Sequence, residues 1–177
     1  MKKLFLFSGI LLLALIAQFQ LAQAQTDQTG NVTVSIDLTA PVISIDLGAD
    51  PNVTFVYSTP EDYTTPQVEP KVGHFTVVSN QDYEVTVQAT EEFTVIPENA
   101  SPIPLSVVQV SVDPSTTGGG TPAIVPLSST AGTLVTDGPA TIGTTYNINY
   151  TIPDATSLID KVPEVYSTTV IYTATQI

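Results

Sequence analysis

The feature that most constrains the fold of this chain is an alternation of apolar and polar residues with a period of two. The alternation is clearest over residues 32–38, 83–89 and 146–152, where Val, Ile, Leu, Tyr or Ala alternates with a polar residue. Successive side chains of a β-strand point to opposite faces, so each run predicts a strand that is buried on one face. The chain has 14 prolines and 10 glycines, which separate such runs at short intervals. We therefore predict about eight to ten short strands in an all-β antiparallel sandwich.

The first alternating run is repeated further along the chain. Residues 34–38 (VSIDL) are followed by residues 43–47 (ISIDL), with Pro41 between them. Because proline interrupts strand pairing, this pattern predicts two short strands separated by a bend. Residues 53–57 alternate as well and predict a further strand.

The middle of the chain predicts a hairpin. The strands expected over residues 72–79 and 83–89 are separated by Asn80-Gln81-Asp82, a cluster that is typical of a turn. Further along, the apolar parity of residues 105–112 changes after Val107, as a one-residue bulge would produce.

The last third of the chain predicts a loop and a closing strand. Residues 113–126 contain Gly118-Gly119-Gly120 and three prolines, and predict a mobile surface loop. Residues 166–175 predict a strand that is central or paired, because an exposed edge of Val, Ile and Tyr would be prone to aggregation.

The N-terminus has the pattern of a cleavable secretory signal. Lys2 and Lys3 precede an apolar run over residues 4–17, and Ala22-Gln23-Ala24 supplies the small residues that signal peptidase requires. The run is shorter than the roughly 20 residues of a membrane-spanning helix. We therefore expect cleavage after Ala24, no membrane insertion afterwards, and export to the periplasm, cell surface or medium. The predicted organisation is a signal peptide over 1–24, a flexible leader over 25–30 and a single sandwich domain over 31–177.

The charge of the chain disfavours several partners. The chain has no Arg, and after cleavage only Lys71 and Lys161 would stand against 17 acidic residues. Nucleic acids, phosphorylated ligands and anionic membranes attract basic groups, so none of them is an expected partner. The absence of Cys excludes disulfides, thiolate metal sites and acylation of a cysteine.

No set of residues predicts catalysis. The one imidazole, His74, has the parity opposite to Phe75 and Val77, so we expect it to face solvent or the rim of the sandwich. The acidic pairs Glu61-Asp62 and Glu91-Glu92 lack Trp or Arg partners for a sugar and are typical of solvated charge. We therefore predict a non-enzyme with no catalytic, cofactor or metal residues. Lys71 and Lys161 could form isopeptide bonds with Asn or Asp, although ordinary exposed lysines are favoured.

Calcium is the ion that the sequence accommodates best. Loop carboxylates can supply the hard oxygen ligands that calcium prefers, but no regularly spaced calcium-binding loop is present. Surface charge is therefore the favoured interpretation, and an extracellular glycan- or calcium-binding module near residues 57–63 is the alternative function. The candidate carboxylates are Asp46, Asp50, Glu61 and Asp62.

Three segments carry a family resemblance, at residues 31–38, 75–87 and 166–173. They resemble small secreted surface proteins of Bacteroidetes-type bacteria and, more distantly, WxL-type cell-surface domains and the coat-protein-U or pilin-like proteins of chaperone-usher systems. The resemblance implies an immunoglobulin-like β-sandwich in a surface structure or appendage, with no catalytic residues to carry over. The chain departs from the WxL pattern because it has no Trp.

One candidate interface follows from the first alternating run. A strand behind a flexible leader can add to the open sheet of a neighbour, through main-chain hydrogen bonds and alternate side chains. The residues of this candidate interface are Val32, Val34, Ile36 and Leu38. The other interpretation, which stays open here, is the first strand of the chain's own sandwich. The predicted function is a secreted or cell-surface structural or adhesive protein, such as a subunit of a coat or pilus-like fibre, with protein partners or self-association through strand pairing.

Overall fold

The computed structural model describes residues 33–38, 40–93 and 102–177. Within this part of the chain, nine strands form two antiparallel sheets whose apolar faces pack against each other. The prediction of an all-β antiparallel sandwich is confirmed. Residues 38–177 form a compact unit, and the predicted signal peptide and leader lie outside the described residues. No helix in the described ranges has the length and hydropathy needed to cross a membrane.

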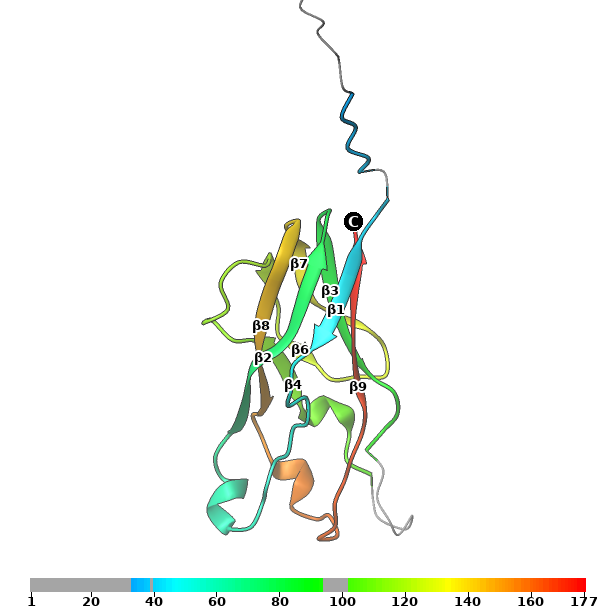
Figure 1. The fold of residues 1–177 in the computed structure, drawn as a ribbon. Coiled ribbons are helices and arrows are strands. Elements are labelled where there is room, and N and C mark those ends of the chain that lie inside the picture. The colour runs from blue at the N-terminus through cyan, green and yellow to red at the C-terminus, as the bar shows by residue number, and fades with distance from the viewer. Residues whose placement is uncertain (1–32, 39, 94–101) are drawn as a thin grey trace, which may run out of the picture. The chain divides into compact units, whose positions relative to one another are not determined.

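The two sheets contain five and four strands (Figure 1). In the five-stranded sheet the order is β1-β2-β8-β4-β6, and in the four-stranded sheet it is β5-β7-β3-β9. The strands span Ile43–Leu47 (β1), Gln67–Ser79 (β2), Tyr83–Ala89 (β3), Gln109–Val112 (β4), Thr121–Pro122 (β5), Val125–Pro126 (β6), Gly132–Gly138 (β7), Thr141–Ile152 (β8) and Val170–Gln176 (β9). Short 3-10 helices occur at Pro60–Tyr63, Leu105–Val107 and Thr156–Leu158.

Alternation places one face of each long strand in the core. In β3 the inward side chains are buried and the others are half-buried, with the same period of two that the sequence shows. β8 follows the same rule from Tyr146 onward. The largest buried side chains of the core, with an exposed fraction below 2 %, include Phe75, Val77, Tyr83, Val85, Leu134, Tyr146 and Ile148.

β2 and β3 do not form the predicted hairpin. β2 pairs with β1 and β8 in one sheet, whereas β3 pairs with β7 and β9 in the other. The turn between them therefore passes from sheet to sheet. Its polar groups bond to other elements, because Val42 N donates to Asn80 Oδ1 (2.9 Å) and Ile177 N donates to Asp82 O (3.0 Å). A turn-forming sequence does not by itself decide whether its flanking strands pair.

A bulge in β2 reverses the parity of His74. The three residues of β2 between Lys71 and Phe75 are opposed by a single residue of β8, Asn147. Gly73 has a left-handed φ of +62°, and its N–H donates to Asn147 Oδ1 at 2.7 Å. His74 and Phe75 are consequently both buried. The expectation that His74 faces solvent or the rim is wrong, because it assumes that apolar and polar residues alternate without interruption where β2 forms a bulge.

Two other predicted strands differ in the structure. Residues 53–57 form no strand, although Val53, Phe55 and Tyr57 still alternate as half-buried side chains packed against the core. The parity change in residues 105–112 comes from the 3-10 helix Leu105–Val107, after which β4 begins, and not from a bulge.

The triple-glycine loop is hydrogen-bonded to β8, and the predicted loop over residues 113–126 contains the short strands β5 and β6. Tyr146 Oη donates to Gly119 O (2.8 Å), and Asn147 N donates to Thr116 Oγ1 (2.9 Å). Glycine composition predicted a loop here, but the buried contact with a distant tyrosine has no local sequence signal.

Candidate functional site

The candidate strand-pairing segment does not belong to the sandwich as a strand. Residues 33–38 have no regular secondary structure, so the alternative in which this run is the first strand of the sandwich is wrong for these residues. The side chains of Val34, Ile36 and Leu38 are 82 %, 81 % and 82 % exposed. Val32 lies outside the described residues. Three alternating apolar side chains are thus exposed in a segment of extended pattern.

The two sheets have four edge strands, and three of them are protected. β5 and β6 have two residues each, and both end in proline, which cannot donate to a further strand. β1 has five residues and carries Asp46 on its exposed face. Short length, proline and charge are the usual features that prevent edge pairing.

β9 is the unprotected edge. It has seven residues, VIYTATQ, with neither proline nor a charged side chain. In the described part of the chain it pairs only with β3. The sequence predicted a central or paired strand; β9 is paired on one side and is an edge on the other. An edge of this length and composition is a template for a further strand.

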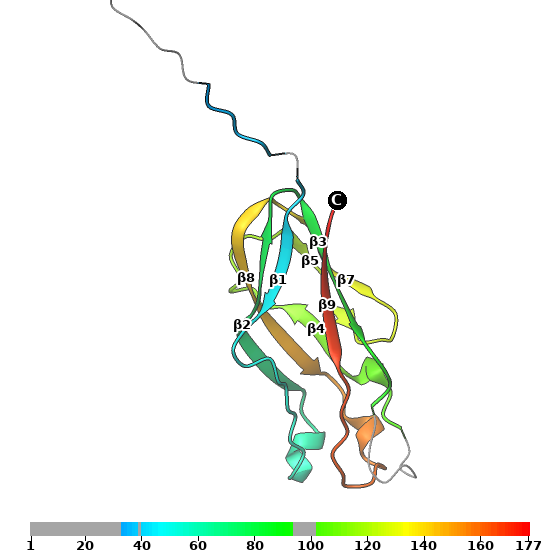
Figure 2. The same cartoon turned by 45° about the vertical axis from the view of Figure 1, so that its right-hand side comes forward.

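The side of the sandwich that contains β1 and β9 is incompletely covered. Figures 1 and 2 show these two strands side by side, with the segment that follows β1 continuing along the same side. The inward side chains here are only partly buried, unlike those of the central strands. They are Ile43, Ile45, Val53, Phe55, Tyr57, Val170, Tyr172 and Ala174.

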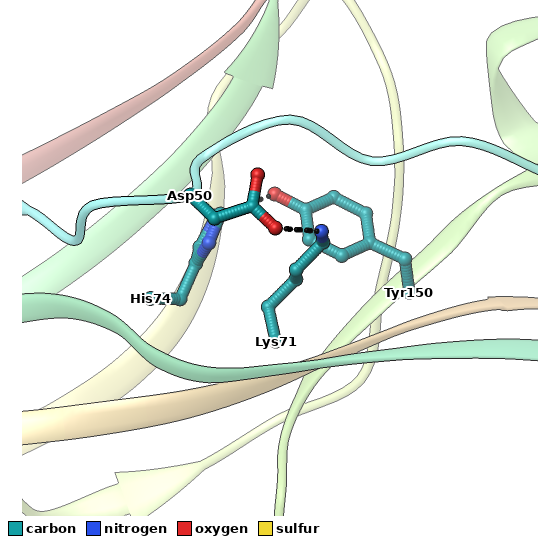
Figure 3. Close-up of polar contacts among 4 residues, drawn as sticks. All are labelled: Asp50, Lys71, His74 and Tyr150. Atoms are coloured by element: carbon teal, nitrogen blue, oxygen red, sulfur yellow. Dashed lines mark hydrogen bonds and ion pairs between the residues drawn. The ribbon is translucent and has the colours of Figure 1, made fainter.

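A buried polar chain crosses the core behind this side. His74 Nε2 lies 2.9 Å from Tyr150 Oη (Figure 3). Tyr150 Oη in turn lies 2.6 Å from Tyr172 Oη. These side chains come from β2, β8 and β9, so the chain of hydrogen bonds joins the two sheets. His74 Nδ1 is buried without a hydrogen-bond partner among the described residues. This favours the neutral tautomer with the proton on Nε2, because a buried N–H without an acceptor is the costlier arrangement.

Burial controls the titration of this cluster. Desolvation, with a smaller contribution from the Lys71 ammonium, lowers the pKa of His74 below 6.5, while Asp50 acts in the opposite direction. Burial raises the pKa of Tyr150 to about 12 and also raises the pKa of Tyr172. At neutral pH the cluster is therefore uncharged, which suits a structural role in the core.

An ion pair lies at the edge of the cluster. Lys71 Nζ is 3.1 Å from Asp50 Oδ2, with exposed fractions of 17 % and 78 % for the two side chains (Figure 3). The expectation of an ordinary exposed lysine is wrong for Lys71, whose side chain is largely covered. The contact is a salt bridge, and its exposed carboxylate limits its contribution to stability to about 1 kcal/mol or less.

The acidic loop does not assemble a metal site. Among the described residues no three His, Asp or Glu side chains are grouped so that they could hold an ion, so Asp46, Asp50, Glu61 and Asp62 are not brought together. Asp62 instead accepts hydrogen bonds from the N–H groups of Ser58 (2.8 Å) and Thr59 (2.7 Å), which lower the pKa of its carboxyl. Asp62 thus acts as part of the cap of the 3-10 helix Pro60–Tyr63.

A shallow cleft of about 520 Å³ lies beside the triple-glycine loop. Its polar groups are already used within the fold: Asp113 accepts from Ser115 N and Asn149 Nδ2, and Tyr146 Oη bonds to Gly119 O and Tyr83 Oη. The cleft therefore offers few free polar groups for orienting a ligand.

Sequence reasoning identified the exposed segment but missed the His74 cluster and the β9 edge. The one available signal for the cluster was Gly73, since a glycine inside a strand often marks a bulge. No known family model matches the chain, and no curated protein matches it either.

Proposed function

We propose that this chain is a non-enzymatic, exported structural or adhesive protein that assembles by strand pairing. The observation that supports the proposal best is the exposed segment of residues 33–38, whose three apolar side chains alternate and lie in no strand of the sandwich. Exposed alternate apolar side chains are unfavourable in water and become favourable when a partner covers them. The family resemblance, which implies a surface appendage, also supports an assembling surface protein.

The remaining chemistry of the described residues fits this proposal. The only histidine is buried in a hydrogen-bonded cluster, and the Asp62 carboxylate of the acidic loop accepts hydrogen bonds from the backbone of Ser58 and Thr59. A catalytic site would need a base and a nucleophile exposed in a common cleft.

The test compares two matched variants of the exported protein. Ile36→Asp places a charge on the apolar face of the segment, and Ser35→Asp places the same charge on its polar face. We expect Ile36→Asp to weaken self-association by more than about tenfold, because the interface would have to bury a carboxylate. Ser35→Asp should leave association close to wild type. Analytical ultracentrifugation measures both, and cell fractionation reports whether the protein reaches the surface.

A wild-type protein that stays monomeric at all concentrations and is not retained at the cell surface would refute the proposal. N-terminal sequencing of the exported protein tests the predicted cleavage after Ala24 in the same preparation.

A further inference from the structure

We propose that the free edge of β9 is the acceptor for residues 33–38 of a second copy of the chain. The inference rests on the proposed function, which requires an acceptor but does not say which edge supplies it. The donor segment and the acceptor edge are both present in each chain, so a head-to-tail contact of this kind could continue from copy to copy.

The acceptor is selected by comparison of the four edges. β5 and β6 are too short and end in proline, and β1 is shorter than β9 and carries Asp46. Only β9 offers seven consecutive residues without proline or charge. A donor strand needs a continuous row of main-chain N–H and C=O groups, and among the described edges β9 provides the longest such row.

The donor matches this edge in length and period. Residues 33–38 nearly equal β9 in length, and both alternate with a period of two. If Val34, Ile36 and Leu38 continue the inner face of the sheet, they lie beside the half-buried row Val170, Tyr172 and Ala174. The polar residues Thr33, Ser35 and Asp37 then continue the outer face, beside Thr173 and Thr175. One pairing thus covers the exposed apolar residues of the donor and completes the burial of the acceptor's inner row.

Charge also favours this edge. The chain has a formal net charge of −13, so most contacts between two copies bring like charges together. β9 contributes no charge, and the donor contributes only Asp37, on its polar face. A second copy can therefore approach β9 with less repulsion than it would meet on an acidic surface.

The experiment uses the absence of native cysteine to place single thiols. One copy carries Ser35→Cys and a second, with a different affinity tag, carries Thr173→Cys on the outer face of β9. Thr133→Cys, an exposed position on the same face of β7, is the matched control, and Ser44→Cys reports on β1. A disulfide forms only when the two Cα atoms come within about 7 Å.

We expect mixed oxidation of Ser35→Cys with Thr173→Cys to give a heterodimer carrying both tags, at a yield at least about tenfold above the Thr133→Cys control. Adding Ile36→Asp to the donor copy should abolish this product. The chain that carries both Ser35→Cys and Thr173→Cys should form linked multimers rather than an intramolecular disulfide.

Three results would overturn the inference. A preferred cross-link to Ser44→Cys would make β1 the acceptor, and an intramolecular disulfide would make the segment a strand of its own chain. Equal yields with Thr173→Cys and Thr133→Cys would mean random collision. In each case ultracentrifugation of the untagged protein still shows whether copies associate, so failure of this inference is separable from failure of the proposed function.

Discussion

At the scale of single residues, His74 makes the stability of the fold depend on pH. It is the only histidine, and the chain has no cysteine, so few other side chains titrate between about pH 7 and pH 5. Burial lowers its pKa below the ordinary 6.5, so the unfolded chain takes up a proton at a higher pH than the folded chain does. Its contribution to stability is therefore complete above about pH 6.5 and is lost as the pH falls through the lowered pKa of the folded state.

We expect the free energy of unfolding to decrease between pH 7 and pH 5, by at most about 1.4 kcal/mol per pH unit for one proton. Urea unfolding at several pH values measures this slope. His74→Gln, which does not titrate, should unfold more easily at pH 7 but show a flatter pH dependence. Parallel curves for the two proteins would assign the slope to other groups.

Substitutions of Gly118 and Gly119 by alanine distinguish the cost of backbone strain from the cost of side-chain crowding. Both have left-handed φ angles, of +77° and +95°. A Cβ at Gly118 would meet nothing within 4 Å, whereas a Cβ at Gly119 would overlap the Tyr146 hydroxyl. Gly118→Ala should cost about 1–2 kcal/mol from strain alone.

Gly119→Ala should cost at least about 2 kcal/mol more than Gly118→Ala, because it also disrupts the buried Tyr146–Tyr83 hydrogen-bond pair. Urea unfolding of the two variants measures the difference. Equal costs would show that the loop moves away from Tyr146 without penalty and is not fixed to β8.

At the scale of elements, Asn80 holds together the ends of three strands. Its Oδ1 accepts hydrogen bonds from Val42 N and Gln176 Nε2, and its Nδ2 donates to Ala40 O, all at 2.9 Å. These bonds connect the entrance of β1, the turn after β2 and the end of β9. An uncharged hydrogen bond contributes about 1 kcal/mol, and less when it is exposed.

We expect Asn80→Ala to destabilise the fold by about 1–2 kcal/mol and to speed amide exchange in β1, whose five residues depend on this connection. Gln81→Ala, one residue away, is the matched control, because only the main chain and not the side chain of Gln81 takes part in the hydrogen bonds of this turn. Unchanged exchange in β1 would mean that its pairing with β2 suffices to hold it.

The elements that the sequence predicted well are those governed by local alternation. Ile43–Leu47 was predicted with its observed bounds, and the period of two in β3 and β8 gave the correct inward faces. The prediction of a hairpin between β2 and β3 was wrong, because tertiary contacts decide whether two consecutive strands pair or lie in different sheets. The prediction that His74 faces solvent or the rim was wrong, because the bulge at Gly73 depends on Asn147, a residue distant in sequence.

One part of the candidate site could likewise be predicted from local sequence and the other could not. The donor segment was found because its alternation is local, whereas the acceptor depends on sheet order. Which strand lies at an edge is set by all the strand pairings together, so residues 166–175 alone could not reveal that β9 is left open. The apolar composition of β9, which suggested a protected strand, instead makes it suitable for pairing.

At the scale of the whole molecule, net charge opposes assembly through any contact. With 17 acidic residues against the two lysines that remain after the predicted cleavage, two copies repel each other at low ionic strength. The proposed contact between residues 33–38 and β9 uses main-chain hydrogen bonds and apolar side chains, which salt does not screen. Raising the ionic strength from 0.01 M to 0.15 M shortens the Debye length from about 30 Å to about 8 Å and so weakens only the repulsion.

We therefore expect the dissociation constant for self-association to fall by about tenfold over this range of sodium chloride concentration. Sedimentation equilibrium of the exported protein measures it, and Ile36→Asp, which should remain monomeric throughout, shows that salt does not cause unspecific aggregation. A dissociation constant that rises with salt would mean that ion pairs hold the copies together. Because β9 carries no charge and the donor carries one, that outcome would place the contact elsewhere on the molecule.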